Sequence, residues 1–164
     1  MEHLWAPWRM EYIEKAVQEP KDCVFCGLLA AQDDAKNLIL YRGKTCFALL
    51  NKFPYNPGHM LVLPLAHKGT LEALTPEESL EFLGLAMRMR GVIEKAMSPQ
   101  GFNLGINLGR AAGAGVPDHI HIHLVPRWTG DCNFMPVLAD VKVLPQALRD
   151  TYHILERTLE SVGT

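Results

Sequence analysis

The sequence lacks the segments that would place a chain in a membrane or along a long polyanion. Its 164 residues contain no signal peptide and no apolar run approaching the ~20 residues of a membrane span, so we expect a cytoplasmic protein. Lys and Arg number 16 against 18 Asp and Glu, and the formal charge of −2 leaves no general basic field for nucleic acid or an anionic membrane. Any polyanion must therefore be bound locally.

The sequence also lacks internal repeats, low-complexity tracts and an interdomain linker. Its hydrophobic share of 48% and charged share of 21% are ordinary for a soluble globular protein, and 164 residues are about one domain. We expect a single domain over residues 1–164, with an N-terminal arm at 1–22 and a C-terminal helical extension at 144–162. The tryptophans of the arm are expected to pack on the core or on a partner subunit, with a direct role in substrate binding as the alternative.

Three alternating histidines are the most unusual feature of the chain. At the strand period of two, His119, His121 and His123 point to one face, and Ile120 and its apolar neighbours point to the other. A helix would scatter the three rings, so we predict a strand that Pro126 ends. Three imidazoles on one face can bind a metal such as zinc, or use one ring as a nucleophile or base. A chance polar cluster on a solvated strand face is the alternative.

A loop of small residues precedes the histidines, over residues 109–117. Such a loop lets backbone N–H groups approach an anion closely, although its glycines match neither the P-loop pattern nor the dinucleotide fingerprint. Alone, it reads equally well as a flexible hairpin connection. Joined to the histidines, it predicts a phosphate held beside a nucleophilic imidazole.

The segment His119-Ile120-His121-Ile122-His123-Leu124-Val125 resembles the motif of the histidine triad family. Asn51, Pro57-Gly58-His59 and Asn107-Leu108-Gly109 match the family in the same order. The N-terminal Leu4-Trp5-Ala6-Pro7-Trp8-Arg9-Met10 and Pro126-Arg127-Trp128 further resemble the branch that contains diadenosine tetraphosphate phosphorylases. The resemblance implies a nucleotide-binding enzyme, commonly a dimer, that cleaves dinucleoside polyphosphates by phosphorolysis or hydrolysis.

The resemblance also implies a role for each site residue. The middle histidine, His121, is expected to attack the α-phosphorus and form a nucleotidyl-histidine, while its other ring nitrogen donates to a backbone carbonyl. His59 is expected to support the active histidines, with a surface imidazole as the alternative. The residues expected to bind phosphate are His123, Gly113, Ala114, Gly115, Val116 and Asn107. The residues expected to bind the nucleoside are Asn51, Phe25, Leu28 and Leu49, and Asn51 has a second reading as a turn residue.

Cysteine is scarce, with four residues in the chain, yet two of them form Cys23-Val24-Phe25-Cys26. Two such thiolates can bind one zinc ion, and a redox pair or two reduced thiols are the alternatives. The resemblance adds His67 and His119 as the other ligands of a structural zinc, and it implies no organic cofactor. Cys46 and Cys132 are expected to be buried apolar residues.

The order of expected elements indicates an α+β fold with a mainly antiparallel sheet of five to six strands. A hairpin at 38–50 and a strand at 60–64 precede a long helix that Thr75, Pro76 and Glu78 begin with a capping box. Strands at 102–108 and 119–125 and a helix from 144 to 161 follow. The long helix is expected to bury the residues Leu80, Leu83, Met87, Val92, Ile93, Ala96 and Met97. A second face with Phe82, Leu85 and Met89 is expected to be available to a partner subunit.

Several functions therefore remain open for the same residues. The sequence favours cleavage of a dinucleoside polyphosphate, with a hydrolase of nucleoside phosphoramidates or other nucleoside monophosphates as the alternative. A metalloenzyme with all three imidazoles around a catalytic metal would lose activity with a chelator. A binding module would keep the nucleotide pocket but form no covalent intermediate.

Overall fold

The computed structural model describes residues 23–131 and 147–162. The expected N-terminal arm at 1–22, Cys132 and the segment to residue 146 lie outside the described residues. The helices are α2 (Val24–Ala30), α3 (Asp34–Asn37), α4 (Pro76–Met97) and α6 (Leu148–Ser161), with a short 3-10 turn, η1, at Arg110–Ala112. The strands are β1 (Ile39–Arg42), β2 (Cys46–Leu50), β3 (Met60–Pro64), β4 (Gly101–Ile106) and β5 (Ile122–Arg127).

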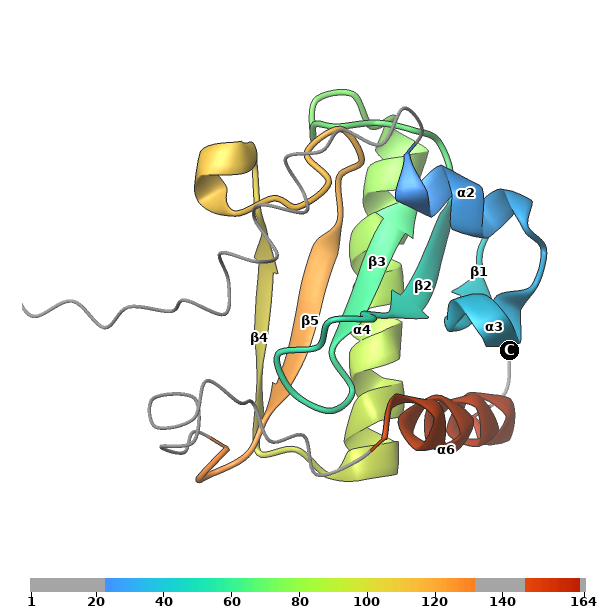
Figure 1. The fold of residues 1–164 in the computed structure, drawn as a ribbon, viewed down its shortest axis with the longest axis vertical. Helices are drawn as coiled ribbons and strands as arrows, with labels where there is room; N and C mark the ends of the chain where they lie inside the picture. Colours follow the sequence, from blue (N-terminus) through green and yellow to red (C-terminus); the bar gives the residue numbers. More distant parts are fainter. Residues whose placement is uncertain (1–22, 132–146, 163–164) are drawn as a thin grey trace, which may run out of the picture.

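The five strands form one antiparallel sheet in the order β1-β2-β3-β5-β4, as Figure 1 shows. Helix α4 packs on one face of the sheet, across β2, β3 and β5, and α6 packs beside α4 and β1. The predicted α+β fold with a mainly antiparallel sheet is confirmed, with five strands. Among the described residues, no helix combines the length and the apolarity that a membrane crossing needs.

The sheet separates two apolar clusters, because successive side chains of a strand point to opposite faces. The larger cluster lies between the sheet and helices α4 and α6, and it includes Val62, Ile122 and Leu124. The smaller cluster lies on the other face, where Phe25 of α2 packs with Leu49 and other side chains of β2 and β3. The histidine site belongs to this second face.

Helix α4 begins as predicted, but only the C-terminal part of its predicted buried face is buried. The side chain of Thr75 accepts from the backbone N–H of Glu78, and the Glu78 carboxylate accepts from the backbone N–H of Thr75. The face predicted to be buried is wrong at its N-terminal half, because Leu80, Leu83 and Met87 are 79%, 55% and 41% exposed. The buried apolar residues are Phe82, Leu85, Ala86, Met89, Val92 and Ile93. Val92 and Ile93 are confirmed, whereas Phe82, Leu85 and Met89 belong to the face expected to meet a partner.

The reason lies in the residue spacing. From Phe82 to Ile93 the buried positions advance by three, one, three, three and one residues, which keeps them on one helical stripe. The predicted set contains a step of five residues between Met87 and Val92, which leaves that stripe. The larger aromatic side chain of Phe82 also gains more from burial than the exposed leucines would.

Strand β5 begins later than predicted and continues through its proline. It starts at Ile122, whereas the prediction began at His119, and Pro126 is paired with Phe102 of β4. The pairing with β3 ends at Leu124, so at Pro126 the strand has a ladder partner on one side only, where a proline is tolerated. The alternation itself is confirmed, since Ile120, Ile122 and Leu124 all lie in the larger core.

The C-terminal helix is confirmed over Leu148–Ser161. Leu155 is fully buried, Leu148 and Leu159 pack partly buried against the larger core, and His153 is exposed as expected. The N-terminal end of α6 reaches α3, where the Arg149 guanidinium donates to the carbonyl of Ala35 at 2.7 Å. This contact brings the C-terminal extension to one end of the cavity described below.

Candidate functional site

The three histidines lie together on the face of the sheet that carries α2. His119 is fully buried, His121 is 6% exposed, and His123 is partly buried. Phe25 of α2 packs against the edges of the first two rings, with ring centroids 5.6 Å from His119 and 5.4 Å from His121. Each imidazole has a different hydrogen-bond partner, so the three rings are held in different ways.

His121 is held by its own strand. Its Nδ1 lies 2.8 Å from the backbone carbonyl of His119, which can only accept, so Nδ1 carries the proton. The expected bond to a backbone carbonyl is confirmed. Burial lowers the pKa of His121, and the bond to the carbonyl opposes that shift in part. The ring is therefore neutral at pH 7, with the lone pair of a nucleophile on Nε2.

His123 is oriented by His59, which is fully buried. The backbone N–H of Tyr55 donates to Nδ1 of His59 at 3.0 Å, so a neutral His59 carries its proton on Nε2. That Nε2 lies 3.0 Å from Nδ1 of His123 and donates to it, which places the proton of His123 on its own Nε2. Burial, and after it the repulsion that a protonated His121 would exert, lower the pKa of His123 to about 4. His123 thus presents an N–H donor while it remains neutral.

A cavity of about 530 Å³ opens beside His121 and His123. Its wall includes the four predicted nucleoside-binding residues, Phe25, Leu28, Leu49 and Asn51, and two predicted phosphate-binding residues, His123 and Val116. Its volume falls in the range of small-molecule sites, and its wall is mostly apolar with a few polar groups. A nucleoside of ordinary size fits these dimensions.

Asn51 forms the turn that its sequence predicts, and it also lines the cavity. Its Oδ1 accepts from the backbone N–H of Phe53 at 2.9 Å, which is the turn expected of an asparagine after a strand. The residue also lines the cavity, and its Nδ2 lies 3.4 Å from the ring of His59. The turn therefore fixes the amide at the cavity wall.

Some backbone N–H groups of the small-residue loop donate within the loop itself. The N–H of Gly113 donates to the carbonyl of Arg110, and the N–H of Ala114 donates to that of Gly109. Asn107 also serves the loop, since its Nδ2 donates to the carbonyl of Gly113 at 3.3 Å. The backbone N–H groups of Gly113 and Ala114 are therefore not directed at a phosphate. Gly115 and Val116 are the remaining backbone donors of the predicted set.

The four predicted metal ligands meet at one point. One ligand atom from each of Cys23, Cys26, His67 and His119 lies within 4.8 Å of all the others. Cys23 caps α2 and Cys26 lies in its first turn, which brings the two sulfurs to one side of the helix. Nδ1 of His119 lies 3.3 Å and 3.7 Å from the two sulfurs, and Cys26 Sγ lies 3.5 Å from Nδ1 of His67.

The donor set suits a divalent metal. Nε2 of His119 donates to the carbonyl of Pro64 at 2.9 Å, which leaves Nδ1 unprotonated toward the sulfurs. Burial, followed by the hydrogen bond and charge of Cys23, raises the pKa of Cys26, and a bound cation would offset this effect. Two thiolates and two imidazoles are a typical tetrahedral zinc set. These four residues can hold a metal ion.

Sequence reasoning missed the other residues of the cavity wall, which are Val24, Lys36, Asn37, Leu38, Leu50, Lys52, Phe53, Leu61, Leu148 and Arg149. Leu61 could have been found, because it pairs with Leu49 across β2 and β3 and so faces the same side. Lys36 and Arg149 come from α3 and α6, and no local pattern connects them to the histidines. Lys52 and Phe53 follow Asn51 directly.

Comparison with known proteins identifies the family. A family model described as HIT domain matches residues 32–130. The AP-4-A phosphorylase of Mycobacterium tuberculosis is 39% identical over 161 residues, which cover 94% of this chain and 83% of that protein. The asymmetrical bis(5'-nucleosyl)-tetraphosphatase of Schizosaccharomyces pombe is 39% identical over 93 residues, which cover 57% of this chain and 50% of that protein.

A solved structure agrees with these sequence matches. A Zn-bound histidine triad family protein from Mycobacterium smegmatis has a TM-score of 0.70 and 26% identity, and the match covers 86% of this chain and 95% of that one. The family model covers the whole triad and all five strands of the sheet that carries it. The chain therefore belongs to the HIT domain family, the family of histidine triad proteins.

Proposed function

We propose that the protein is an enzyme that cleaves dinucleoside polyphosphates, such as diadenosine tetraphosphate, at an α-phosphorus. The observation that carries this proposal is the orientation of His121, whose protonated Nδ1 is bonded to the carbonyl of His119 in a ring that lines the cavity. The names of the relatives, a phosphorylase and a tetraphosphatase, support the substrate class.

The first chemical step follows from the tautomer of His121. The Nε2 lone pair attacks the α-phosphorus in line, and a P–N bond forms as the bond to the bridging oxygen breaks. The remainder of the substrate leaves, as adenosine triphosphate in the case of diadenosine tetraphosphate. His123 donates its Nε2–H to a nonbridging oxygen, and the amides of Gly115 and Val116 add further donors.

The second step cleaves the nucleotidyl-histidine. An oxygen of inorganic phosphate or of water attacks the same phosphorus, the P–N bond breaks, and Nε2 of His121 regains its lone pair. Phosphate yields adenosine diphosphate, whereas water yields adenosine monophosphate. We propose phosphorolysis, in keeping with the relative from Mycobacterium tuberculosis that matches 94% of the chain.

The metal site is proposed to be a structural zinc site. Zinc held by Cys23, Cys26, His67 and His119 would join α2 to the start of the triad segment, and it would fix the position of the His119 carbonyl that orients His121. His119 has no proposed part in the chemical steps. Thiolate ligands also suit a reducing compartment, which supports a cytoplasmic location.

A homodimer is proposed from exposed apolar side chains on the edge strand β4 and on α4. Strand β4 is the edge strand, and its Leu104 is 42% exposed. Leu104 is the register partner of Leu124, so both side chains point to the α4 side of the sheet. On α4, which packs on that side of the sheet, Leu83 and Met87 are also exposed. Light scattering of the wild type and of Leu104→Asp tests this proposal, and a monomeric wild type contradicts it.

Product analysis tests the proposed activity. Diadenosine tetraphosphate is incubated with the enzyme with and without inorganic phosphate, and the nucleotides are separated by chromatography. Phosphorolysis predicts adenosine diphosphate and triphosphate in equal amounts, only when phosphate is present. Adenosine monophosphate and triphosphate would instead indicate hydrolysis, and an unchanged substrate in both reactions contradicts the proposed function.

A further inference from the structure

The first part of the triad segment lies outside the sheet. Strand β5 begins at Ile122, and its ladders with β3 and β4 both begin there. Two residues before Ile122, the same register would set Ile120 against Pro64. Proline has no N–H for such a ladder, and its carbonyl accepts from the ring of His119 instead. The ladders therefore do not include residues 119–121.

The loop after β3 holds this backbone in place of the strand. The backbone N–H of Ile120 donates to the carbonyl of Lys68 at 2.6 Å. The next loop residue, Gly69, approaches Asp118 closely. A Cβ atom built on Gly69 would lie 3.2 Å from the Asp118 Cα, which is closer than ordinary van der Waals contact. The loop at 65–75 and the start of the triad segment are therefore in direct backbone contact.

One peptide unit connects this contact to the proposed nucleophile. The carbonyl of His119 and the N–H of Ile120 belong to the same planar trans peptide, so they point in opposite directions. The N–H is bonded to Lys68, and the carbonyl accepts from Nδ1 of His121 at 2.8 Å. A rotation of this peptide would change both bonds. The carbonyl of Lys68 therefore helps to fix the orientation of the His121 ring.

An ion pair anchors the loop to helix α4. Nζ of Lys68 lies 2.6 Å from Oε2 of Glu78, and the two side chains are 23% and 10% exposed. The same oxygen accepts from the backbone N–H of Thr75, so the carboxylate is also bound to the start of the helix. Solvent screens a partly buried pair less than an exposed pair. Lys68 is thus held at both its ammonium group and its carbonyl.

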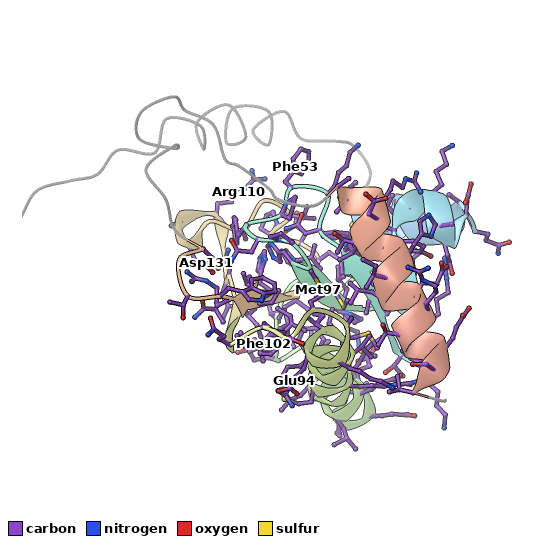
Figure 2. All side chains as sticks on the ribbon, turned by 90° about the horizontal axis from the view of Figure 1, so that it is seen from below. Phe53, Glu94, Met97, Phe102, Arg110 and Asp131 are labelled. Carbon is purple, nitrogen blue, oxygen red and sulfur yellow. The ribbon has the colours of Figure 1, made fainter. Side chains whose placement is uncertain are left out.

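The ion pair joins two parts of the molecule that the sheet separates. Figure 2 shows Glu94 of α4 and Phe53 of the cavity wall on opposite sides of the molecule. In Figure 1, the chain passes over one end of the sheet between β3 and α4. Through this loop, Glu78 at the start of the helix is connected to the histidine side of the sheet.

We propose that Lys68, held by Glu78, is a positioning residue for the nucleophile His121. Its carbonyl fixes the peptide between His119 and Ile120, and its ion pair keeps that carbonyl in place. This inference rests on the proposed function and needs no metal. Lys68 is not part of the cavity wall, so its loss should lower kcat and leave KM almost unchanged.

Kinetics of charge-removing variants test the ion pair. Lys68→Met is expected to lower kcat for diadenosine tetraphosphate about tenfold and to change KM less than about twofold, as for the loss of a supporting group. Lys68→Arg keeps the charge and should restore most of kcat. Glu78→Gln keeps an oxygen for the helix cap, and adding it to Lys68→Met should cause no further loss, because both act through one pair.

The matched control breaks another ion pair of the same helix. Arg90→Met removes the pair with Glu94 at 3.0 Å, whose side chains are 40% and 54% exposed. It should leave kcat unchanged. Metal analysis of Lys68→Met should find the zinc content of the wild type, because the proposed effect does not pass through the metal ligands.

Hydrogen exchange tests the anchor without catalysis. In Lys68→Met, the amide of Ile120 should exchange several times faster than in the wild type, because its acceptor is less firmly held. The amide of Leu124, which is paired within the sheet on both sides, should exchange at an equal rate in the two proteins.

A raised KM with an unchanged kcat would overturn the proposal, as would equal exchange rates at Ile120. A lower kcat accompanied by loss of zinc would assign the effect to the metal site and would also overturn it. If the wild type does not cleave diadenosine tetraphosphate, the proposed function fails. Faster exchange at Ile120 in Lys68→Met would still support Lys68 as the anchor of the peptide that orients His121.

Discussion

The two faces of the sheet differ in the kind of side chain that they bury. On the face covered by α4 and α6, the buried residues are almost entirely apolar, and Leu124 is fully enclosed by them. On the face covered by α2, three buried imidazoles, His59, His119 and His121, lie beside a small apolar cluster. Neighbouring residues of β5 serve the two faces in turn, so one strand connects a packed core to a chemical site.

The difference shows how buried polar groups are tolerated. Each of the three buried imidazoles has a hydrogen-bond partner, and no buried side-chain nitrogen or oxygen among the described residues lacks one. On the α4 face, the side chains must have volumes that pack together. On the α2 face, each buried hydrogen-bond donor must meet an acceptor. Substitutions on the first face should therefore change stability, and substitutions on the second should change chemistry.

The largest effect is expected for His121→Ala on the histidine face. Loss of the nucleophile should lower kcat by at least about 10⁴-fold, because nucleophile removal in other enzymes has effects of this size or larger. Nucleotide binding should persist, since the apolar wall is unchanged. Steady-state kinetics and calorimetric titration measure the two properties. Near-normal turnover by this variant would rule out His121 as the nucleophile.

Substitution of one leucine on each face compares the two faces directly. Leu124→Ala, on the α4 side, should lower the free energy of unfolding by about 2–5 kcal/mol and leave KM unchanged. Leu61→Ala, which removes a cavity-lining side chain on the other side, should lower stability and also raise KM. Urea denaturation and kinetics on the folded variants provide the comparison. A similar rise in KM for both variants would contradict the division between the faces.

Loss of a proposed zinc ligand should affect stability more than chemistry. Cys23→Ala should remove zinc, and the melting temperature should fall by several degrees, at roughly 2–4 °C per kcal/mol for a chain of this size. Metal analysis and calorimetry test this outcome, and Cys46→Ala is a control at a buried cysteine outside the metal cluster. If metal analysis finds no zinc in the purified wild-type protein, the proposed zinc site is contradicted.

His59→Phe, which keeps a ring but removes its N–H donor, should act through His123. Without the His59 donor, Nδ1 of His123 is no longer held as an acceptor, and the N–H presented to phosphate is no longer fixed. We expect kcat to fall by about 10–100-fold, with a smaller change in KM, as is usual when a supporting hydrogen bond is lost. Stopped-flow kinetics and a melting curve separate this effect from unfolding. An unchanged kcat would show that His59 has no positioning role.

The smallest effect concerns pH. The pKa of His123 falls from 6.5 to about 4 in the folded protein, so the unfolded chain binds more protons between these values. The stability due to neutral His123 is complete above pH 6.5 and is lost as the pH falls toward 4. His123→Gln should therefore show a flatter decline in unfolding free energy over this range. Equal slopes of unfolding free energy against pH for the wild type and His123→Gln would contradict the lowered pKa of His123.

Much of the fold was predictable because it depends on local patterns. The period of two placed the histidines and isoleucines on opposite faces, and the capping box fixed the start of α4 at Thr75. The buried face of the N-terminal half of α4 was not predicted, because apolar residues occur there on two stripes and the packing partner decides between them. Leu83 and Leu85 are chemically alike, yet only Leu85 meets the sheet.

The site was predictable only in part for the same physical reason. The triad, Asn51 and the C-x-x-C pair carry their chemistry in a few adjacent residues. Lys36 and Arg149 come together only through the packing of α3 and α6, and their sequence separation conceals that contact. The amides of the small-residue loop were overcounted, since a sequence does not reveal that Gly113 donates within the loop itself.

The central claim is that the histidine face supplies a free imidazole nitrogen that attacks phosphorus. The most direct measurement is mass spectrometry of the wild-type protein, quenched at alkaline pH during turnover of diadenosine tetraphosphate, because a phosphorus–nitrogen bond survives there. We predict an adenylyl group on the peptide that contains His121, and none in His121→Asn. An adduct on another residue, or turnover with no adduct at any time, would contradict the account.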